Sequence, residues 1–416
     1  MTFVRRDGEL CAEGVPLTEI ARRFGTPCYV YSRTAIERNW NAWRDALAGR
    51  PHLLCYAVKA NSNLAILELL ATLGAGFDIV SGGELQRVLR AGGDAGRVVF
   101  SGVGKSRAEI EAALSAGIRC FNVESAAELD RIAVVAKAAG RRAPVALRVN
   151  PEVEPGTHPH VSTGVRGSKF GLTCDEALAL ARKAAASDAL EFLGLACHIG
   201  SQIVDIKPYL AALDRLLSLA GALREQGIRL QHLDLGGGLG IRYRDEDPPA
   251  PADLVEAVYR HPGVQGLELH FEPGRSVVGA AGVLLTRVEY LKPAATGTFV
   301  IVDAGMNDLM RPALYGAWQD VVAVRPAPDA PELDCDVVGP VCESTDFLAR
   351  GRRLAAREGD LLAILGAGAY GAVMASNYNS RPRPAEVLVQ GDRLTEVRRR
   401  DDFEDLIRGE TRLPQP

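Results

Sequence analysis

The sequence predicts an α/β fold: a parallel (β/α)8 barrel of the TIM type over residues 30–275, followed by a β-barrel or β-sandwich domain over residues 276–416. Residues 1–29 are expected to join the β domain. Two observations lead to this prediction. From Leu53 to Pro273, short apolar runs alternate with stretches in which apolar residues recur every three or four positions. After Pro273 the long helical patterns disappear, while short apolar runs continue.

The barrel interval contains eight candidate strands. Each is a short apolar run, as expected for a parallel strand buried on both faces. Eight such strands with helices between them close most readily into a barrel. An open, doubly wound sheet is the competing fold, but the first strand ends in Lys59 instead of the G-x-G-x-x-G loop that marks it. The strands centre on Leu54–Val58, Phe77–Val80, Val98–Phe100, Cys120–Val123, Val145–Val149, Phe192–Cys197, His232–Leu235 and Leu267–Phe271.

Helical patterns fill most of the gaps between these strands. Many end at a glycine, which accepts the positive φ of a helix terminus, as at Gly74, Gly92, Gly117, Gly140 and Gly227. The helices are predicted at Ala65–Leu73, Glu84–Ala91, Arg107–Ala116, Ser125–Ala138, Asp175–Ala186 and Pro208–Gln226.

The β domain is predicted from apolar runs with no helical spacing between them. Before the barrel, only Thr18–Phe24 has a helical pattern within the first thirty residues. Near the end, Arg398–Ile407 carries mixed charges and is interpreted as a solvated face. The predicted strands are Val277–Tyr290, Phe299–Val302, Asp334–Val338, Leu361–Leu365 and Glu386–Val389.

Composition excludes several classes of function. The formal net charge is −4 with interleaved signs, so we expect neither a nucleic-acid partner nor a membrane partner. The longest nearly uncharged apolar stretch, Leu361–Met374, is short for a membrane span and is interrupted by glycines. Charges run through Met1–Gly14, where a signal peptide would need an apolar segment. The eight cysteines form no C-x-x-C pair and no cluster with zinc spacing. We therefore predict a reduced, cytoplasmic protein without a metal site.

Functional residues of a parallel barrel collect at the carboxyl ends of its strands. Lys59 ends an apolar strand, either as a side chain that reaches solvent or as a desolvated amine suited to Schiff-base chemistry. Gly236–Gly238 is either a tight turn or a loop whose N–H groups approach a phosphate. Glu272–Arg275 supplies an acid and a guanidinium, or is a surface turn. His198–Ser201 offers an imidazole that stacks on a cofactor ring, or a structural histidine.

Each of these motifs is a weak signal alone, but their combination and their order along the chain indicate one family. With two motifs from the β domain, they resemble the alanine-racemase-fold decarboxylases that depend on pyridoxal phosphate (PLP), which have a PLP-binding (β/α)8 barrel followed by a β domain. The motifs are Tyr56–Asn61, His198–Ser201, Gly236–Gly238, Glu272–Arg275, Cys342–Ser344 and Ala369–Gly371. Others resemble the diaminopimelate decarboxylases of that family: Ser81–Glu84, His160–Gly164, Lys169–Gly171, Met310–Tyr315 and Gly339–Ser344.

The resemblance implies a cofactor, PLP, and residues that hold it. Lys59 would bind its aldehyde covalently, and His198 would stack on its ring. Glu272 would pair with the pyridine nitrogen, and Ser201, Gly238 and Arg275 would bind or border the phosphate. The complete implied cofactor-binding set is Lys59, Asp78, His198, Ser201, Gly236, Gly237, Gly238, Glu272, Gly274, Arg275 and Tyr370.

The resemblance also implies a reaction: decarboxylation of meso-2,6-diaminopimelate at its D-centre to L-lysine and CO2, the last step of lysine biosynthesis. Cys342 would protonate the carbanion, with Glu343 beside it. In this family both come from the partner subunit, so a homodimer with shared active sites is implied. Catalysis would rest on Lys59, Cys342 and His198, and substrate binding on Arg275, Arg311, Tyr315, Glu343 and Tyr370.

Substrate chemistry agrees with these assignments. The departing carboxylate should stay unpaired, because pairing would stabilise the ground state and oppose loss of its charge. Arg275 and Arg311 would hold the distal carboxylate instead, and Glu343 the distal ammonium. Ornithine and lysine have no distal carboxylate, which disfavours decarboxylation of D-ornithine, D-lysine or carboxynorspermidine as the alternative. A catalytically inactive regulatory relative is a further alternative, disfavoured because Lys59, Cys342 and Gly236–Gly238 are all present.

Three segments carry further expectations. Thr345–Phe347 stands where the family pattern has Gly-Asp, and Ser380 stands where members often carry glycine, so we expect local loop differences only. We hypothesise that the loop around His158–Gly167 closes over the site, because glycine and proline are frequent there. Protease sensitivity that is unchanged by a substrate analogue would contradict this closure.

Overall fold

The computed structural model describes residues 2–154, 168–295, 297–326 and 329–414, and the segment His158–Gly167, for which closure over the site is hypothesised, lies outside them. The chain forms two compact units. The barrel unit comprises Glu37–Arg242 and Glu246–Val277, and the β unit comprises Met1–Ile36, Tyr243–Asp245 and Val278–Pro416.

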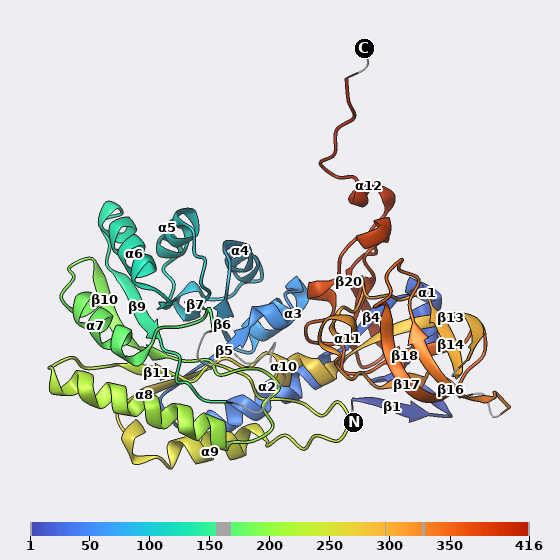
Figure 1. Cartoon of the computed structure of the whole chain (residues 1–416), viewed down its shortest axis with the longest axis horizontal. Coiled ribbons are helices and arrows are strands. Elements are labelled where there is room, and N and C mark those ends of the chain that lie inside the picture. The colour runs from blue at the N-terminus through green and yellow to red at the C-terminus, as the bar shows by residue number, and fades with distance from the viewer. Residues whose placement is uncertain (1, 155–167, 296, 327–328, 415–416) are drawn as a thin grey trace. The chain divides into compact units, whose positions relative to one another are not determined.

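All eight predicted barrel strands are present, and they close into one parallel barrel in the order β10-β11-β12-β5-β6-β7-β8-β9 (Figure 1). Most side chains of these strands are buried, which explains why the runs are almost uniformly apolar. The strands are β5 (His52–Ala57), β6 (Gly76–Ile79), β7 (Val98–Phe100), β8 (Cys120–Val123), β9 (Ala143–Arg148), β10 (Leu190–Ala196), β11 (His232–Asp234) and β12 (Glu268–Phe271).

Helices surround the barrel strands, as Figure 1 shows. Local sequence fixes their ends. The Ser106 and Thr173 side chains each form a capping box, with Glu109 and Glu176 respectively. The five predicted terminal glycines all have positive φ, between 61° and 79°. The helices are α2 (Arg33–Leu47), α3 (Leu64–Thr72), α4 (Gly82–Arg90), α5 (Arg107–Ala116), α6 (Ala126–Ala138), α7 (Cys174–Ala185), α8 (Lys207–Glu225), α9 (Pro251–Tyr259) and α10 (Arg275–Val278).

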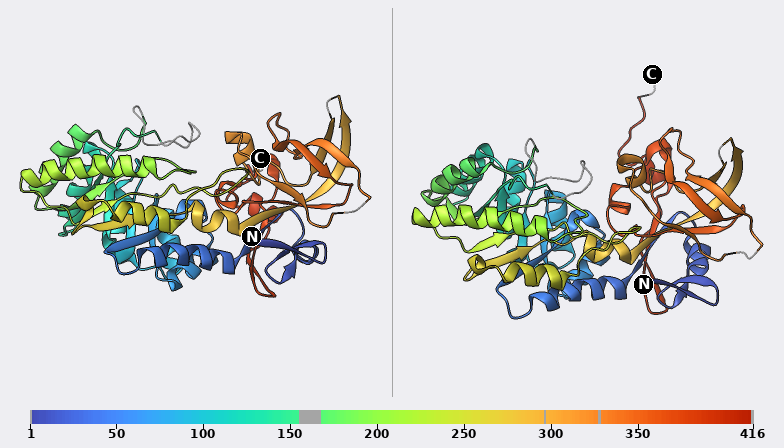
Figure 2. Two further views of the ribbon diagram at one scale, coloured as in Figure 1. Left: turned by 90° about the horizontal axis from the view of Figure 1, so that it is seen from below. Right: turned by 60° about the horizontal axis from the view of Figure 1, so that its bottom comes forward.

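The β unit is built on a nine-stranded sheet with the main order β17-β16-β14-β13-β4-β19-β20. The N-terminal segment enters this sheet, because β4 pairs with both β13 and β19, and the blue N-terminal strands lie beside the orange ones in both views of Figure 2. The first three strands form a separate three-stranded sheet: β1 (Phe3–Arg6), β2 (Glu9–Ala12) and β3 (Val15–Pro16). The strands of the nine-stranded sheet are β4 (Cys28–Ser32), β13 (Gly282–Ala294), β14 (Gly297–Val302), β15 (Val321–Ala323), β16 (Glu332–Val338), β17 (Phe347–Ala355), β18 (Leu361–Ile364), β19 (Ala385–Gln390) and β20 (Arg393–Arg398).

The unit also has three short helices, α1 (Leu17–Phe24), α11 (Arg311–Tyr315) and α12 (Phe403–Leu406). Helix α1 matches the helical pattern predicted at Thr18–Phe24. Its Leu17 and Ile20 join one hydrophobic cluster with Val30 of β4 and Leu285 of β13. Apolar burial of this kind is what attaches the N-terminal segment to the sheet.

Two sequence predictions for the β unit are corrected. The strand predicted from Val277 begins only at Gly282, because Val277 and Val278 lie fully buried in α10. A short apolar run does not distinguish a buried helical turn from a strand. The charged run Arg398–Ile407 is not uniformly solvated: Asp401 is buried and accepts hydrogen bonds from Arg383 Nε (2.8 Å) and Asn377 Nδ2 (3.0 Å).

Among the described residues, no helix combines the length and the apolar character needed to cross a bilayer.

Candidate active site

A pocket of about 400 Å³ lies at the carboxyl ends of the barrel strands, where the sequence predicted it. Every residue that lines it belongs to the barrel unit. The lining residues are Lys59, Val80, Ser101, Gly102, Val103, Gly104, Asn122, Arg148, Phe170, Ala196, Cys197, His198 and Glu272. Three predicted site residues, Lys59, His198 and Glu272, thus share one cavity.

Lys59 lies in a 3₁₀ turn, Val58–Ala60, directly after β5. Its side chain is 32% exposed, and its Nζ forms an ion pair with Asp78, whose side chain is fully buried on β6. The pair keeps the amine at the pocket and prevents it from extending into solvent. The structure therefore combines an anchored amine with access from the cavity, as a nucleophile requires.

Glu272 follows β12 and is almost completely buried. Burial, with the neighbouring carboxyl groups of Asp234 and Asp78, raises the pKa of Glu272 well above its ordinary value. Its Oε1 atom has no hydrogen-bond partner among the described residues. Asp234 is held by Asn122 Nδ2 (3.1 Å) and by the Gly236 N–H (2.8 Å). The barrel therefore presents a buried carboxyl group with a raised pKa and one oxygen that has no hydrogen-bond partner among the described residues.

His198 follows β10 and is neutral. Burial, together with the positive charges of Lys59 and Arg148, lowers the pKa of His198 well below its ordinary value. Its Nδ1 accepts a hydrogen bond from the Gly237 N–H (3.3 Å), so the proton of the neutral ring is on Nε2. A fixed, uncharged imidazole suits the predicted stacking role.

The glycine loop after β11 is required by close backbone packing. A Cβ atom at Gly236 would lie 2.6 Å from the Cys197 carbonyl oxygen, and one at Gly237 would overlap the Glu272 carbonyl oxygen. Gly238 has a φ of 105°, which favours glycine. Because Gly236 and Gly237 donate their N–H groups to Asp234 and His198, their first effect is to position those two side chains.

Arg275 and Ser201 lie together in the barrel unit, next to this loop in the fold. Arg275 begins α10, is buried, and donates from Nη2 to Ser201 Oγ (2.9 Å). A Cβ atom at Gly274 would lie 2.9 Å from the Ala60 side chain, so the turn before Arg275 packs tightly on the turn that carries Lys59. The guanidinium and hydroxyl are the groups that bind phosphate oxygens.

Sequence reasoning missed three polar residues of this region: Asn122, Arg148 and Asp234. Each lies within or at the last residue of a strand, whereas the prediction considered residues just past the strands. Arg148 is paired with Glu124 (2.9 Å) and its guanidinium lies 4.9 Å from the Phe170 ring centroid. A buried polar residue inside an apolar strand is the signal that would have identified all three.

The remaining predicted residues belong to the β unit. Arg311, the first residue of α11, is buried, with its guanidinium 4.7 Å from the centre of the Tyr243 ring. Tyr315 ends the same helix and is half-buried. Tyr370 follows β18 with a φ of 54°. Cys342 and Glu343 are exposed in the turn between β16 and β17.

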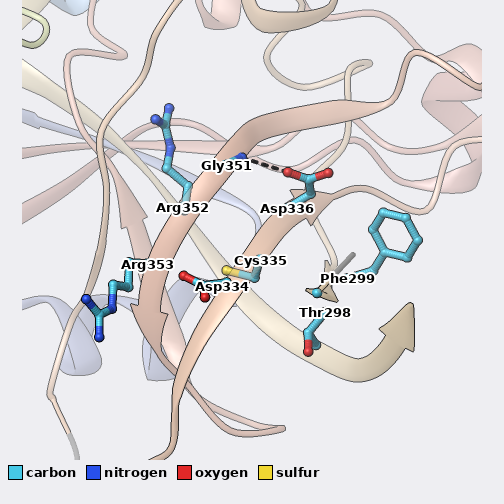
Figure 3. A pocket seen from close by; sticks show the side chains of 9 residues that line it. Thr298, Phe299, Asp334, Cys335, Asp336, Gly351, Arg352 and Arg353 are labelled. Atoms are coloured by element: carbon cyan, nitrogen blue, oxygen red, sulfur yellow. Dashed lines mark hydrogen bonds between the residues drawn. The ribbon is translucent and has the colours of Figure 1, made fainter. Parts of the chain in front are cut away.

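A second hollow, of about 230 Å³, lies on β14, β16 and β17 of the β unit. Figure 3 shows Asp334 and Asp336 on one strand and Arg352 and Arg353 on the next, with the Gly351 N–H donating to Asp336 (2.7 Å). The residues that line this hollow include none of the predicted site residues. We therefore assign the active site to the barrel pocket.

The raised pKa of Glu272 predicts a pH-dependent stability of the cofactor-free protein. An acid whose pKa is higher in the folded than in the unfolded chain destabilises the fold as pH rises from its unfolded pKa through its folded one. Glu272→Gln should therefore raise the melting midpoint at pH 8 by about 3 °C, roughly 1 kcal/mol. The two proteins should converge only below the unfolded pKa, at about pH 4. Thermal denaturation at pH 4 and pH 8 checks this, and an equal difference at both pH values would contradict it.

Comparison with known proteins gives a consistent result. Residues 33–279 match the family of pyridoxal-dependent decarboxylases, over its pyridoxal binding domain. Diaminopimelate decarboxylase of Pseudomonas aeruginosa is 59% identical over 414 residues, with 100% of each chain covered.

Two solved structures similar to this chain are also diaminopimelate decarboxylases. Diaminopimelate decarboxylase from Helicobacter pylori, complexed with L-lysine, superposes with a TM-score of 0.90 at 43% identity, over 94% of this chain and 98% of that one. The enzyme from M. jannaschii, in co-complex with L-lysine, gives 0.94 at 39% identity, over 99% and 98%. The chain therefore belongs to the pyridoxal-dependent decarboxylases, within their diaminopimelate decarboxylase branch.

Proposed function

We propose that this enzyme removes CO2 from the D-centre of meso-2,6-diaminopimelate to give L-lysine, with PLP as its cofactor. The observation that carries the proposal is one pocket that contains both the Lys59 amine and the buried Glu272 carboxyl, whose pKa is raised. The pocket occurs in a chain that matches a diaminopimelate decarboxylase along its full length.

The residues present fit PLP. The buried Oε1 of Glu272 has no hydrogen-bond partner among the described residues, and a pyridine nitrogen would supply one. Lys59 offers an amine for the aldehyde carbon, held at the pocket by Asp78. Ser201, Gly238 and Arg275 would hold the phosphate, and the neutral His198 would lie on the ring.

Bound PLP supplies an electron sink for the electron pair left behind when CO2 departs. Glu272 would pair with the ring nitrogen, and burial, which raises the pKa of this carboxyl group, favours a proton shared between the two. Val80, Val103 and Phe170 make part of the pocket wall apolar, which disfavours the charged carboxylate relative to CO2. Cys342 would deliver a proton from Sγ to the carbon that loses the carboxylate.

Substrate selection would depend on the distal end of diaminopimelate. Arg311 and Arg275 are predicted to hold the distal carboxylate, and Glu343 the distal ammonium. The stacking of the Arg311 guanidinium on Tyr243 supports this role, because it fixes the orientation of the planar donor group.

We also propose that the enzyme is a homodimer with shared active sites, in which the partner subunit contributes Cys342 and Glu343. The family resemblance supports this arrangement, and the exposure of both residues on a turn of the β unit is compatible with it. The location in the cytoplasm stays a prediction, consistent with the free thiols of all eight cysteines.

Replacement of Arg311 tests the substrate assignment. Arg311→Met keeps much of the side-chain volume and removes the guanidinium, so KM for meso-diaminopimelate should rise by about 10- to 100-fold. The affinity for PLP should not change. Arg353→Met, at an exposed arginine of β17, serves as the control and should leave KM unchanged. An unchanged KM in Arg311→Met would contradict the assignment.

A further inference from the structure

The turn that carries Cys342 and Glu343 is held by a second segment of the β unit, Tyr378–Asn379. The Cys342 backbone N–H donates to Asn379 Oδ1 (2.8 Å). The Tyr378 hydroxyl donates to Glu343 Oε1 (2.8 Å). Two consecutive residues of one segment thus bind two consecutive residues of the other. The two segments are separated by 35 to 37 positions in the chain.

The other side of this turn is fixed from within the β unit. Asp346 is buried, and its carboxylate accepts hydrogen bonds from the Val341 N–H (2.8 Å) and the Met306 N–H (2.6 Å). The turn closes on itself as well, because the Glu343 N–H donates to the Val341 carbonyl (2.8 Å). Asp346 therefore anchors the base of the turn, while Tyr378 and Asn379 contact its two functional residues.

Asn379 reaches Cys342 through an unusual backbone conformation. Its φ is 55° and its ψ is 28°, in the left-handed region that asparagine tolerates better than most residues. The neighbouring Ser380 has nearly the same φ, 54°, and is exposed. Two successive residues of this segment thus have a left-handed backbone.

We propose that Tyr378 and Asn379 are positioning residues for catalysis: Asn379 sets the place of the Cys342 thiol, and Tyr378 sets the orientation of the Glu343 carboxylate. The inference rests on the proposed roles of Cys342 as proton donor and Glu343 as ligand of the distal ammonium. The two residues of this segment should therefore affect two different kinetic parameters. Asn379 acts on the chemical step through Cys342, and Tyr378 acts on substrate binding through Glu343.

Because Asn379 and Ser380 both have positive φ, substitutions in the PLP-loaded enzyme can separate loss of a side-chain contact from a change of backbone conformation. Asn379→Gly removes the acceptor oxygen but keeps a residue that adopts positive φ readily. Asn379→Asp keeps an acceptor oxygen and is the rescue variant. Ser380→Gly makes the same backbone change one residue later, without loss of the contact to Cys342. Tyr378→Phe removes only the hydroxyl group.

We expect a split between kcat and KM. Asn379→Gly should lower kcat for meso-diaminopimelate by about three- to tenfold, with KM within about twofold. Asn379→Asp and Ser380→Gly should stay within about twofold in both parameters. Tyr378→Phe should raise KM by about three- to tenfold and leave kcat nearly unchanged. Equal effects of Asn379→Gly and Ser380→Gly, or a loss of kcat alone in Tyr378→Phe, would overturn the inference.

Thiol chemistry gives a second readout that does not depend on turnover. Cys174 and Cys342 are exposed, whereas the other six cysteines are buried, so Cys174→Ala leaves one accessible thiol. In that background, Asn379→Gly should change the rate of Cys342 alkylation by iodoacetamide by about threefold or more, and Ser380→Gly should not. An unchanged rate in Asn379→Gly overturns the positioning role. If the parent enzyme fails to convert meso-diaminopimelate, the proposed function fails, while the alkylation rates still test the contact.

Discussion

Lys59→Ala should reduce turnover of meso-diaminopimelate by at least about 10³-fold and remove the visible absorbance of bound PLP. The amine of Lys59 is the group placed to bind the cofactor aldehyde, since it ends β5 at the pocket and is anchored by Asp78. Turnover by product formation and an absorbance spectrum of the purified protein measure the two effects separately.

A charge-preserving variant distinguishes the nucleophile from the ion pair. Lys59→Arg retains a cation beside Asp78, so the fold of the pocket should be kept, but a guanidinium does not replace the nucleophilic amine. It should therefore be as inactive as Lys59→Ala while its thermal stability stays closer to that of the parent enzyme. Activity in Lys59→Arg above one-tenth of the parent would contradict the nucleophile assignment. Lys183→Ala, at an exposed lysine of α7, is the neutral control.

Cys342→Ala should keep the cofactor spectrum but lower turnover by about 10²- to 10³-fold, because a positioned proton donor contributes an effect of that order. The thiol is exposed in a turn of the β unit. Full activity in Cys342→Ala would show that another group protonates the carbon that loses the carboxylate.

Subunit mixing tests whether the sites are shared. If each site takes Lys59 from one subunit and Cys342 from its partner, a mixed dimer of Lys59→Ala and Cys342→Ala has one intact site and one doubly altered site. An equimolar random mixture should then recover about a quarter of the parent activity, because half of its dimers are mixed. No recovery after verified exchange would show that one chain supplies both residues.

The barrel could be predicted because its strands are buried on both faces and its helices carry explicit end signals. The run Leu54–Val58 is apolar throughout and buried, and the glycines after α5 and α8 have the positive φ expected of them. The strands of the β unit were harder to predict from the sequence. Strands β17 and β20, at the two ends of the main sheet path, were missed because their arginines hide the apolar alternation.

The candidate site also contains residues that the sequence predicted and residues that it did not. Lys59, His198 and Glu272 could be found because they follow strands at positions where a barrel places functional groups. Asn122, Arg148 and Asp234 could not be found that way, because they belong to the strands themselves, and only barrel closure brings Asn122 of β8 to Asp234 of β11. The contacts of Asn379 and Tyr378 with Cys342 and Glu343 depend on a left-handed backbone that the sequence does not reveal.

The central claim is the substrate and the product. Purified, PLP-loaded enzyme should be incubated in parallel with meso-diaminopimelate, D-ornithine and L-ornithine, and the products and CO2 should be identified. We predict L-lysine and CO2 from meso-diaminopimelate alone, because the other two substrates lack the distal carboxylate assigned to Arg311. Turnover of either ornithine in its place, or no turnover of meso-diaminopimelate by protein with an intact cofactor spectrum, would contradict the proposed function.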